Sequence, residues 1–292
     1  MRPMRARTNG IELEYESFGS PADPTVLLVM GFSLQMIDWD ERFCLELAAR
    51  GFRVVRFDNR DVGLSSQIEG APSPNIGALM TGDTSSAAYS LDDMADDTVG
   101  LLDALGIASA HLVGMSMGGM IAQLVAIRAP ARVRSLCSIM STTGDRKVGN
   151  ATPAALGVLL TPVPAEREAN VARSVEVWRV LASPSQPIDE PTTRARAAVA
   201  YDRAFCPLGA ARQLAAILSA RDRSPELAKL SVPALVIHGV DDPLIAPDGG
   251  EATARAIPGA ELVLVPEMGH ELPPRVWPRV LDAIAANAAR AA

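Results

Sequence analysis

Ser116 lies in a sequence setting that suits nucleophilic chemistry. It is the central residue of a Gly-x-Ser-x-Gly pattern at 114–118, with an apolar run before it and a helical apolar pattern at 117–127 after it. A strand that turns directly into a helix holds the residue at the turn in a strained backbone conformation, and flanking glycines leave room for a close approach of the chain. The pattern therefore predicts a serine hydroxyl that projects from the turn and can attack a carbonyl carbon.

Such an attack places negative charge on the carbonyl oxygen, and two backbone groups are candidates to stabilise it. Met117 begins the expected helix, so its N–H has no partner inside the helix and can face that charge. Phe32 follows the apolar run 25–30, and loops that leave neighbouring parallel strands lie side by side. Its N–H is the second candidate, although an ordinary loop with a buried phenylalanine would have the same sequence.

The chain has three histidines from which a general base could come. His111 and His238 lie inside or at the end of apolar runs, where a core or supporting residue with a satisfied hydrogen bond is the simpler interpretation. His270 lies in a loop after the last apolar run. We therefore expect His270 to be the base, and because an unperturbed histidine titrates near about pH 6.5, we expect activity to fall in acid.

Two adjacent carboxylates can orient that base. Asp241 and Asp242 come just after the apolar run 232–239, at the sheet edge where Ser116 is expected. Either carboxylate can hold the imidazole of His270, so the residue pattern alone leaves both open. The chain order Ser, Asp, His is typical of one particular α/β fold.

The surrounding sequence predicts an α/β fold that brings these residues to one sheet edge. Continuous apolar runs are typical of strands buried on both faces of a parallel sheet, and alternation is typical of a half-exposed strand. Helical patterns separate most of these runs. The expected strands are 10–17, 25–30, 53–57, 110–113, 133–140, 232–239 and 261–265, and the expected core helices are 42–49, 91–105, 117–127 and 274–292.

From 144 to about 227, helical patterns dominate and no strand-like run interrupts them. We expect a first core part at 1–143, an inserted helical cap at 144–227 and a second core part at 228–292. Apolar residues of the cap could line a hydrophobic pocket, or they could form a small core of the cap itself. These residues are Leu156, Val158, Leu159, Leu160, Val177, Trp178 and Val180.

Several charged groups have simpler, structural interpretations. The aspartates and Arg60 of the loop 58–65 are expected to brace that loop, and the polar segment 66–90 is expected to be a mobile connection. Four acidic residues near the start of the helix 91–105 are expected to form a solvated face. They are Asp92, Asp93, Asp96 and Asp97.

Composition limits the partners. Lys and Arg total 27 against 34 Asp and Glu, a formal net charge of -7, which argues against binding to nucleic acid or an anionic membrane. We expect no membrane span and no secretion signal, and the three widely spaced cysteines favour reduced thiols in a cytoplasmic protein. Neither a phosphate-binding glycine loop nor a cluster of metal ligands is visible, so we expect no cofactor and no metal. The sequence leaves the oligomeric state open.

Four motifs together resemble the α/β-hydrolase family, and the likeness extends over nearly the whole chain. They are Gly114-Met115-Ser116-Met117-Gly118-Gly119, Arg60-x-x-Gly63-x-Ser65, His238-Gly239-x-x-Asp242-Pro243 and Gly269-His270. The resemblance implies an eight-stranded, mostly parallel sheet flanked by helices, with an inserted helical cap. It also implies that Asp242, directly before the proline, is the acid of the triad.

Two positions depart from the usual family pattern. Met30-Gly31 stands where the family usually has His-Gly, and Asp61 stands where a glycine often follows the loop arginine. Both features are similar to a subgroup of bacterial esterases that includes aclacinomycin methylesterase and lipase-like proteins. Neither departure removes a catalytic side chain.

The resemblance implies a serine hydrolase that cleaves carboxylic esters of small to medium hydrophobic substrates through an acyl-enzyme intermediate. In that mechanism Ser116 is the nucleophile, His270 the base and Asp242 the residue that orients it. Cofactor-free haloperoxidases or perhydrolases and carbon–carbon bond hydrolases of the same fold use the same triad, so they stay open as alternatives. A ligand-binding receptor that keeps the pocket is the alternative from another class, which an intact triad disfavours.

Overall fold

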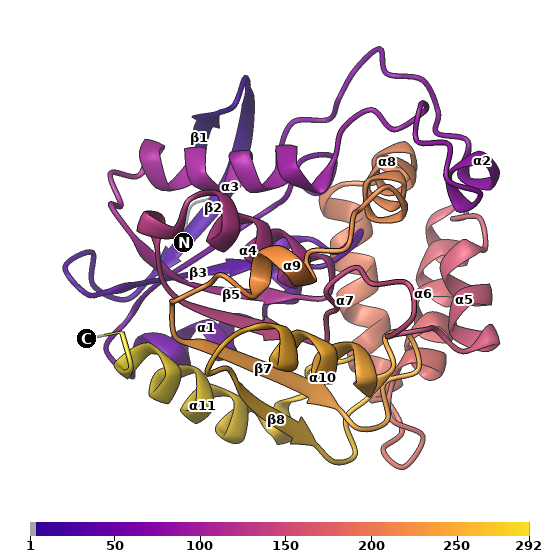
Figure 1. The fold of residues 1–292 in the computed structure, drawn as a ribbon. Coiled ribbons are helices and arrows are strands. Elements are labelled where there is room, and N and C mark those ends of the chain that lie inside the picture. Colours follow the sequence, from indigo (N-terminus) through magenta and orange to yellow (C-terminus); the bar gives the residue numbers. More distant parts are fainter. Residues whose placement is uncertain (1–3, 292) are drawn as a thin grey trace.

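The computed structural model describes residues 4–291 and has one eight-stranded sheet covered by helices on both faces (Figure 1). Across the sheet the strand order is β1-β2-β4-β3-β5-β6-β7-β8. The pairs β1–β2 and β2–β4 are antiparallel and all the others are parallel, which confirms the predicted α/β architecture. The strands are β1 (Met4–Thr8), β2 (Ile11–Phe18), β3 (Thr25–Val29), β4 (Arg53–Phe57), β5 (Ala110–Met115), β6 (Val133–Ile139), β7 (Ala234–Gly239) and β8 (Glu261–Val265).

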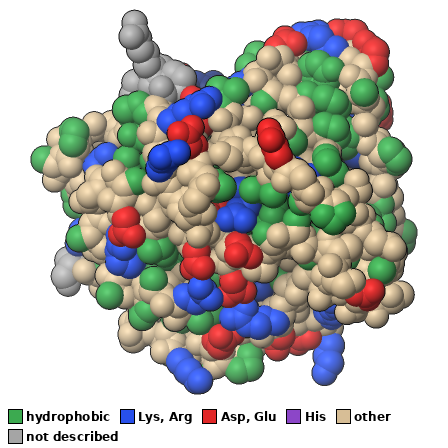
Figure 2. All heavy atoms as spheres, turned by 90° about the horizontal axis from the view of Figure 1, so that it is seen from above, with side chains coloured by type: hydrophobic (Ala, Val, Ile, Leu, Met, Phe, Trp, Pro, Cys, Tyr) green, Lys and Arg blue, Asp and Glu red, His purple; other side chains and the backbone are tan. Residues whose placement is uncertain are grey.

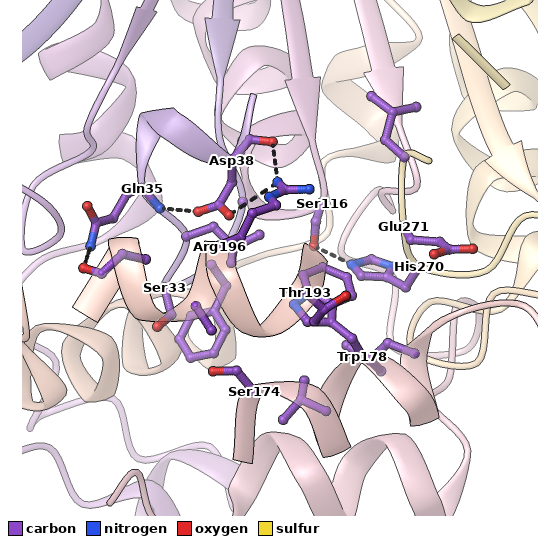
Figure 3. A pocket seen from close by; sticks show the side chains of 18 of the residues that line it. Ser33, Gln35, Asp38, Ser116, Ser174, Trp178, Thr193, Arg196, His270 and Glu271 are labelled. Carbon is purple, nitrogen blue, oxygen red and sulfur yellow. Dashed lines mark hydrogen bonds and ion pairs between the residues drawn. The ribbon is translucent and has the colours of Figure 1, made fainter. Parts of the chain in front are cut away.

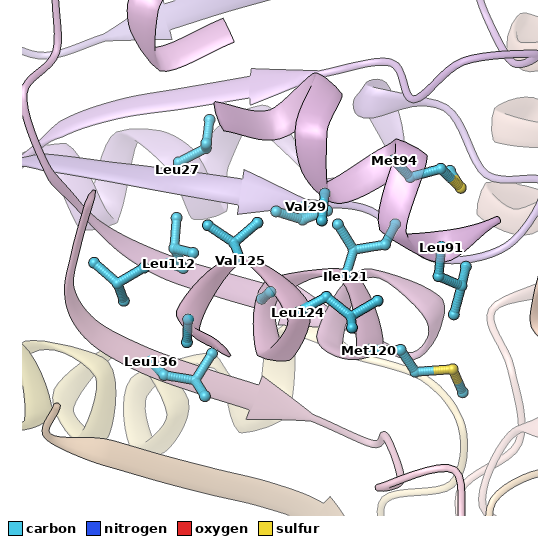
Figure 4. Packing of buried hydrophobic residues seen from close by; sticks show 14 of the residues in the cluster. Leu27, Val29, Leu91, Met94, Leu112, Met120, Ile121, Leu124, Val125 and Leu136 are labelled. Atoms are coloured by element: carbon cyan, nitrogen blue, oxygen red, sulfur yellow. The ribbon is translucent and has the colours of Figure 1, made fainter. Parts of the chain in front are cut away.

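Helices pack on the sheet because each presents an apolar face to it. One face of the sheet is covered by α3 (Leu91–Ala104), α4 (Met117–Arg128) and α10 (Pro247–Ala256), which pack into one hydrophobic cluster with the strands. The helices α1 (Glu41–Ala48) and α11 (Trp277–Ala289) cover the other face. Figure 4 shows side chains of α4 interdigitating with those of the central strands.

The helix α4 is buried almost all round, which explains its lack of a polar face. Ten consecutive residues, 117–126, are buried because α3, β5 and β6 surround them. A helix held on several sides is fixed in position and in rotation. Its first residue therefore offers a rigid platform for the residue that precedes it, Ser116.

The segment between β6 and β7 is helical, as the sequence indicates. It contains α5 (Pro153–Leu160), α6 (Arg167–Leu181), α7 (Glu190–Arg203), α8 (Pro207–Leu218) and α9 (Ser224–Leu227). Figure 1 shows α5, α6 and α7 to one side of the sheet. The short helix α9 contacts α4 and α10 instead, and Ala216 of α8 belongs to the cluster shared with α3 and α4. The division into core and cap at 144 and 227 stays a prediction.

The loop 58–65 is tied to its neighbours by buried ion pairs. Arg60 binds Asp97 of α3 through two contacts of 2.6 and 2.7 Å, and Asp61 binds Arg212 of α8 at 2.6 and 2.7 Å. These charges brace the loop against other elements and do not pair with each other. The expectation of a solvated Asp97 is therefore wrong, because its side chain is buried to hold Arg60.

The connection 66–90 contains one short helix, α2 (Ile76–Met80), which begins after an Asn75 cap. The side chain of Asn75 accepts a hydrogen bond from the Ala78 N–H, so local capping makes the turn helical. Within residues 4–291, no helix has the length and apolar character required to cross a membrane. The face in Figure 2 shows basic and acidic side chains interspersed.

Candidate active site

Ser116 lies at the turn between β5 and α4 in a backbone conformation that few residues other than glycine adopt. Its φ is 55° and its ψ is -120°. The conformation is held because the Ser116 N–H donates to the Ile139 carbonyl (2.9 Å) and the Ser116 carbonyl accepts from the Gly119 N–H (2.9 Å). A strained residue held in this way at a cavity is a candidate for function.

Two glycines of the motif are required by close approach rather than by backbone freedom. A Cβ at Gly114 would lie 2.1 Å from the Gly118 carbonyl oxygen, and a Cβ at Gly118 would lie 2.1 Å from the Val29 carbonyl oxygen. Both distances are far inside van der Waals contact. The elbow therefore packs tightly against the first turn of α4 and the end of β3.

The imidazole of His270 lies between Ser116 and Asp242. Its Nε2 is 3.0 Å from the Ser116 Oγ, and its Nδ1 is 2.8 Å from the Asp242 Oδ2 (Figure 3 shows the serine and histidine). The His270 N–H donates to the Leu181 carbonyl at the end of α6 (2.7 Å), so an inserted helix holds its backbone. These distances are those of a nucleophile, a base and the group that orients the base.

Asp242 is buried and receives several donors. Its Oδ1 accepts from the N–H groups of Leu244 and Ile245, both at 2.9 Å. Burial by itself raises the pKa of Asp242, but His270 and His238 beside the carboxylate outweigh it and bring the pKa well below its usual range. The carboxylate is therefore ionised and ready to orient the imidazole.

The neighbouring aspartate has a different partner. The Asp241 Oδ2 accepts a hydrogen bond from the Ser183 hydroxyl at 2.6 Å. Ser183 lies just after α6, so Asp241 ties β7 to the inserted segment. Of the two carboxylates that the residue pattern left open, only Asp242 lies within hydrogen-bond distance of His270.

The other two histidines are buried, and each has one ring nitrogen within hydrogen-bond distance of a partner. His111 Nδ1 lies 2.8 Å from the Ser135 Oγ on β6, and burial, together with the charge of Arg134, lowers the pKa of His111 to about 4. His238 is fully buried, and its Nε2 lies 2.8 Å from the Ile245 carbonyl oxygen. Its Nε2 is also 3.4 Å from the Asp242 carboxylate, so His238 lies beside the aspartate and not beside Ser116.

The backbone of the loop after β3 lies against the elbow. A Cβ at Gly31 would lie 3.2 Å from the Ser116 Cβ, and Phe32 lines the same cavity as Ser116. Within residues 4–291, neither Phe32 nor Met117 uses its N–H in a hydrogen bond. Both groups are therefore free to receive an oxyanion, in keeping with their proposed role.

Ser116 and His270 open onto a cavity of about 550 Å³ between the sheet edge and the inserted helices. Aromatic side chains of both parts line it, including Trp39 of the core and Trp178 of α6. The seven apolar residues that the sequence singled out in this segment have different environments. Val158, Leu159, Val177 and Trp178 line the cavity, Leu156 and Leu160 are 39% and 38% exposed, and Val180 is half-buried outside the cavity lining.

Asp38 and Arg196 form a charged pair in the cavity wall that the sequence did not reveal (Figure 3). The Arg196 Nη2 lies 3.5 Å from the Asp38 carboxylate and 3.2 Å from its carbonyl oxygen. Burial raises the pKa of Asp38, and the guanidinium of Arg196 opposes this effect. The two residues are far apart in the chain and belong to no local motif, so no sequence signal could have paired them.

Comparison with known proteins shows which family the chain belongs to. The profile of the family described as "alpha/beta hydrolase fold" matches residues 24–273. The chain belongs to the alpha/beta hydrolase fold family. The order of Ser116, Asp242 and His270 along this hydrolase is the order of nucleophile, acid and base in that fold.

This hydrolase is similar over nearly its whole length to rhodomycin D methylesterase DnrP of Streptomyces peucetius, with 32% identity over 305 residues and 98% of each chain covered. A protein of Mycobacterium tuberculosis provisionally named non-heme bromoperoxidase is 28% identical over 277 residues, which cover 89% of this chain and 91% of that protein. A thermophilic esterase from Thermogutta terrifontis has a similar solved structure, with a TM-score of 0.70, 27% identity and coverage of 100% and 99%. The expected family and its similarity to bacterial methylesterases are confirmed.

Proposed function

We propose that this protein is a serine hydrolase of carboxylic esters in which Ser116, His270 and Asp242 form the catalytic triad. The observation that carries the proposal is the continuous contact from the Ser116 Oγ to His270 (3.0 Å) and from His270 to Asp242 (2.8 Å). The methylesterase relative of similar length supports ester hydrolysis as the reaction.

The reaction has two stages, acylation of Ser116 and deacylation by water. His270 Nε2 takes the Ser116 proton while the Oγ attacks the ester carbonyl, and the N–H groups of Phe32 and Met117 receive the oxyanion. Collapse of the tetrahedral intermediate breaks the bond to the alcohol oxygen, which leaves with the proton from His270. Water then gives its proton to His270 and attacks the acyl-enzyme, and the same steps release the carboxylic acid and free Ser116.

The substrates we propose are hydrophobic esters of small to medium size. A cavity of about 550 Å³ has room for a group larger than a short acyl chain, and its wall contains several aromatic and aliphatic side chains. The name of the Streptomyces relative refers to a methyl ester. This supports a substrate whose alcohol part is small and whose acid part is larger. A cytoplasmic location is also part of the proposal, supported by three free cysteines.

Two measurements test this function: labelling by a fluorophosphonate, and hydrolysis of p-nitrophenyl esters from acetate to octanoate. We expect one adduct per chain at Ser116, and we expect Ser116→Ala to lose both labelling and turnover, with kcat falling by about 10⁶-fold. Ser174→Ala changes another serine of the cavity wall and is expected to keep the adduct. A folded wild-type protein that neither labels nor turns over would favour a ligand-binding receptor.

Halide oxidation through a peracid is the second candidate, favoured by the relative provisionally named as a bromoperoxidase. Hydrogen peroxide would replace water in the second half of the reaction and leave as a peracid, which oxidises bromide in solution. Bromination that depends on peroxide and on a carboxylic acid, and that exceeds ester hydrolysis in rate, would support this candidate. Cleavage of a vinylogous diketone at a rate above that of ester hydrolysis would instead support a carbon–carbon bond hydrolase.

A further inference from the structure

The loop between β3 and the next helical turn has to hold the Phe32 N–H in place without any regular secondary structure. Ser33, the following residue, has a φ of 60°, a conformation that is unfavourable for a serine. A strained segment of this kind keeps its shape only if groups around it fix the peptide planes. Two side chains, Gln213 and Asn59, bind the backbone on either side of Phe32.

Gln213 of α8 binds the backbone after Phe32. It is fully buried, its Oε1 accepts from the Ser33 N–H at 2.8 Å, and its Nε2 donates to the Arg60 carbonyl at 2.8 Å. Only one orientation of the amide makes both bonds, because the acceptor must face the N–H and the donor must face the carbonyl. The side chain therefore joins the loop after β3 to the loop after β4.

Asn59 binds the backbone before Phe32. Its Nδ2 donates to the Met30 carbonyl at 2.9 Å in a buried contact. The peptide between Met30 and Gly31 and the peptide between Phe32 and Ser33 are thus both held. The one peptide between them, which carries the Phe32 N–H, is bracketed on both sides.

The helix that carries Gln213 is itself anchored beside the same site. Arg212, the preceding residue, binds Asp61 through two buried contacts of 2.6 and 2.7 Å. A Cβ at Gly209, one turn earlier, would lie 2.1 Å from the Asp61 carbonyl oxygen, so α8 is in tight backbone contact with the loop. Gln213 therefore approaches the loop from a fixed helix.

We propose that Gln213 is a positioning residue for ester hydrolysis: by accepting the Ser33 N–H, it keeps the Phe32 N–H aimed at the oxyanion. The inference rests on the proposed function and extends it, because it assigns to α8, in the inserted segment, a part in stabilising the transition state. Gln213 is not among the residues that line the cavity, and its hydrogen bonds go to the Ser33 N–H and the Arg60 carbonyl. Its effect on the reaction therefore acts through the loop that carries the Phe32 N–H.

Gln213→Met and Gln213→Glu separate this role from a merely structural one. Methionine has a similar length and makes neither hydrogen bond, whereas glutamate retains an oxygen that can accept from the Ser33 N–H and, when ionised, loses the donor to the Arg60 carbonyl. We expect Gln213→Met to lower kcat by about 10- to 100-fold, somewhat less than the loss of a whole oxyanion donor, with KM changed by less than about threefold. We expect Gln213→Glu to recover at least about half of that loss on a logarithmic scale.

The affinity for a trifluoromethyl ketone, which forms a hemiketal oxyanion on Ser116, is the second measurement. A positioning role predicts that this affinity falls in parallel with kcat across the two variants. Asn287→Leu is the matched control, since Asn287 is another buried amide that donates to a backbone carbonyl (Leu136, 3.0 Å), on the far helix α11. It is expected to lower thermal stability and to leave kcat and ketone affinity unchanged.

Active sites are counted by fluorophosphonate labelling so that kcat refers to folded protein. If Gln213→Met is competent for labelling and has the kcat and ketone affinity of the wild type, the positioning role is overturned and the esterase proposal stays intact. If Gln213→Met does not fold, a Gln213→Glu enzyme whose kcat falls without any loss of ketone affinity would overturn the role. A wild-type protein without labelling or turnover would instead contradict the proposed function itself.

Discussion

At the scale of single residues, the two adjacent aspartates after β7 differ in what they touch. Asp242 contacts His270 and accepts two backbone N–H groups, while Asp241 contacts Ser183. Side chains that follow one another along an extended chain point in different directions, so two adjacent aspartates have different partners, one beside the proposed base and one in the inserted segment.

Asp242→Asn should therefore lower kcat by about 10⁴-fold, because an amide cannot select the imidazole tautomer that accepts the serine proton. Asp241→Asn is the matched control and should leave kcat within about threefold, since it alters one hydrogen bond away from His270. Steady-state kinetics with a p-nitrophenyl ester measures both. Equal losses in the two variants would show that the imidazole is oriented in another way.

At the scale of elements, close backbone packing sets which glycines tolerate a side chain. Gly118→Ala should destabilise the protein by more than about 3 kcal/mol, because its Cβ would lie 2.1 Å from a backbone oxygen of β3. Gly157→Ala in α5 is the control: its Cβ would meet nothing within 4 Å, and helix propensity predicts a gain of about 0.5–1 kcal/mol. Urea unfolding of the two variants checks this contrast.

The pair His111–Ser135 joins β5 to β6 and makes the sheet sensitive to acid. In the folded state the pKa of His111 is about 4, below its ordinary value of 6.5, so the unfolded chain takes up a proton first as the pH falls. Stability is therefore lost progressively between about pH 6.5 and pH 4.

His111→Gln removes the titrating group and keeps a polar partner for Ser135. We expect the variant to lose less stability than the wild type between pH 7 and pH 4.5, by on the order of 1 kcal/mol. Unfolding free energies from urea titrations at the two pH values give the difference. An identical pH dependence in the two proteins would mean that other groups account for the acid sensitivity.

Strong local patterns made much of the fold predictable. Seven strands were expected close to their observed positions: the strand at 10–17 from its alternating pattern, and the others from apolar runs typical of a parallel sheet. β1 was missed since only Ala6 and Thr8 of its five residues are buried, and arginines dominate its outward face. α10 was missed because its two adjacent glycines, Gly249 and Gly250, oppose a helix locally, whereas tertiary packing on β7 stabilises it.

The residues of the candidate site also differ in whether a local sequence pattern indicates them. Ser116 was identifiable because the elbow is a local motif, and His270 because few histidines competed for the role. The polar contacts of the cavity and of the loop after β3 had no such signal. Arg196 and Gln213 lie on helices whose place against the core depends on the tertiary structure, which a pattern along the chain does not encode.

At the scale of the whole molecule, buried ion pairs fix the inserted helices to the sheet edge. Asp61→Asn should cost about 3–5 kcal/mol, because it leaves Arg212 buried without its partner. Asp202→Asn is the control; it removes an exposed partner of Arg167 on the inserted helices and should change stability little. Thermal and urea unfolding distinguish the two. A stability loss as small for Asp61→Asn as for Asp202→Asn would show that α8 is held by apolar packing alone.

The insertion point after β6 also bears on how such enzymes diversify. Ser116, Asp242 and His270 come from segments that the inserted helices do not interrupt, so recombination between relatives can exchange α5 without cutting the catalytic backbone. α6 and α8 are the exceptions, since the Leu181 carbonyl of α6 accepts from the His270 N–H and α8 supplies Gln213 and Arg212. A chimaera that acquires a foreign pocket should therefore keep the host's Leu181 and the host chain from Pro207 onward, so that new selectivity is gained on an inherited reaction centre.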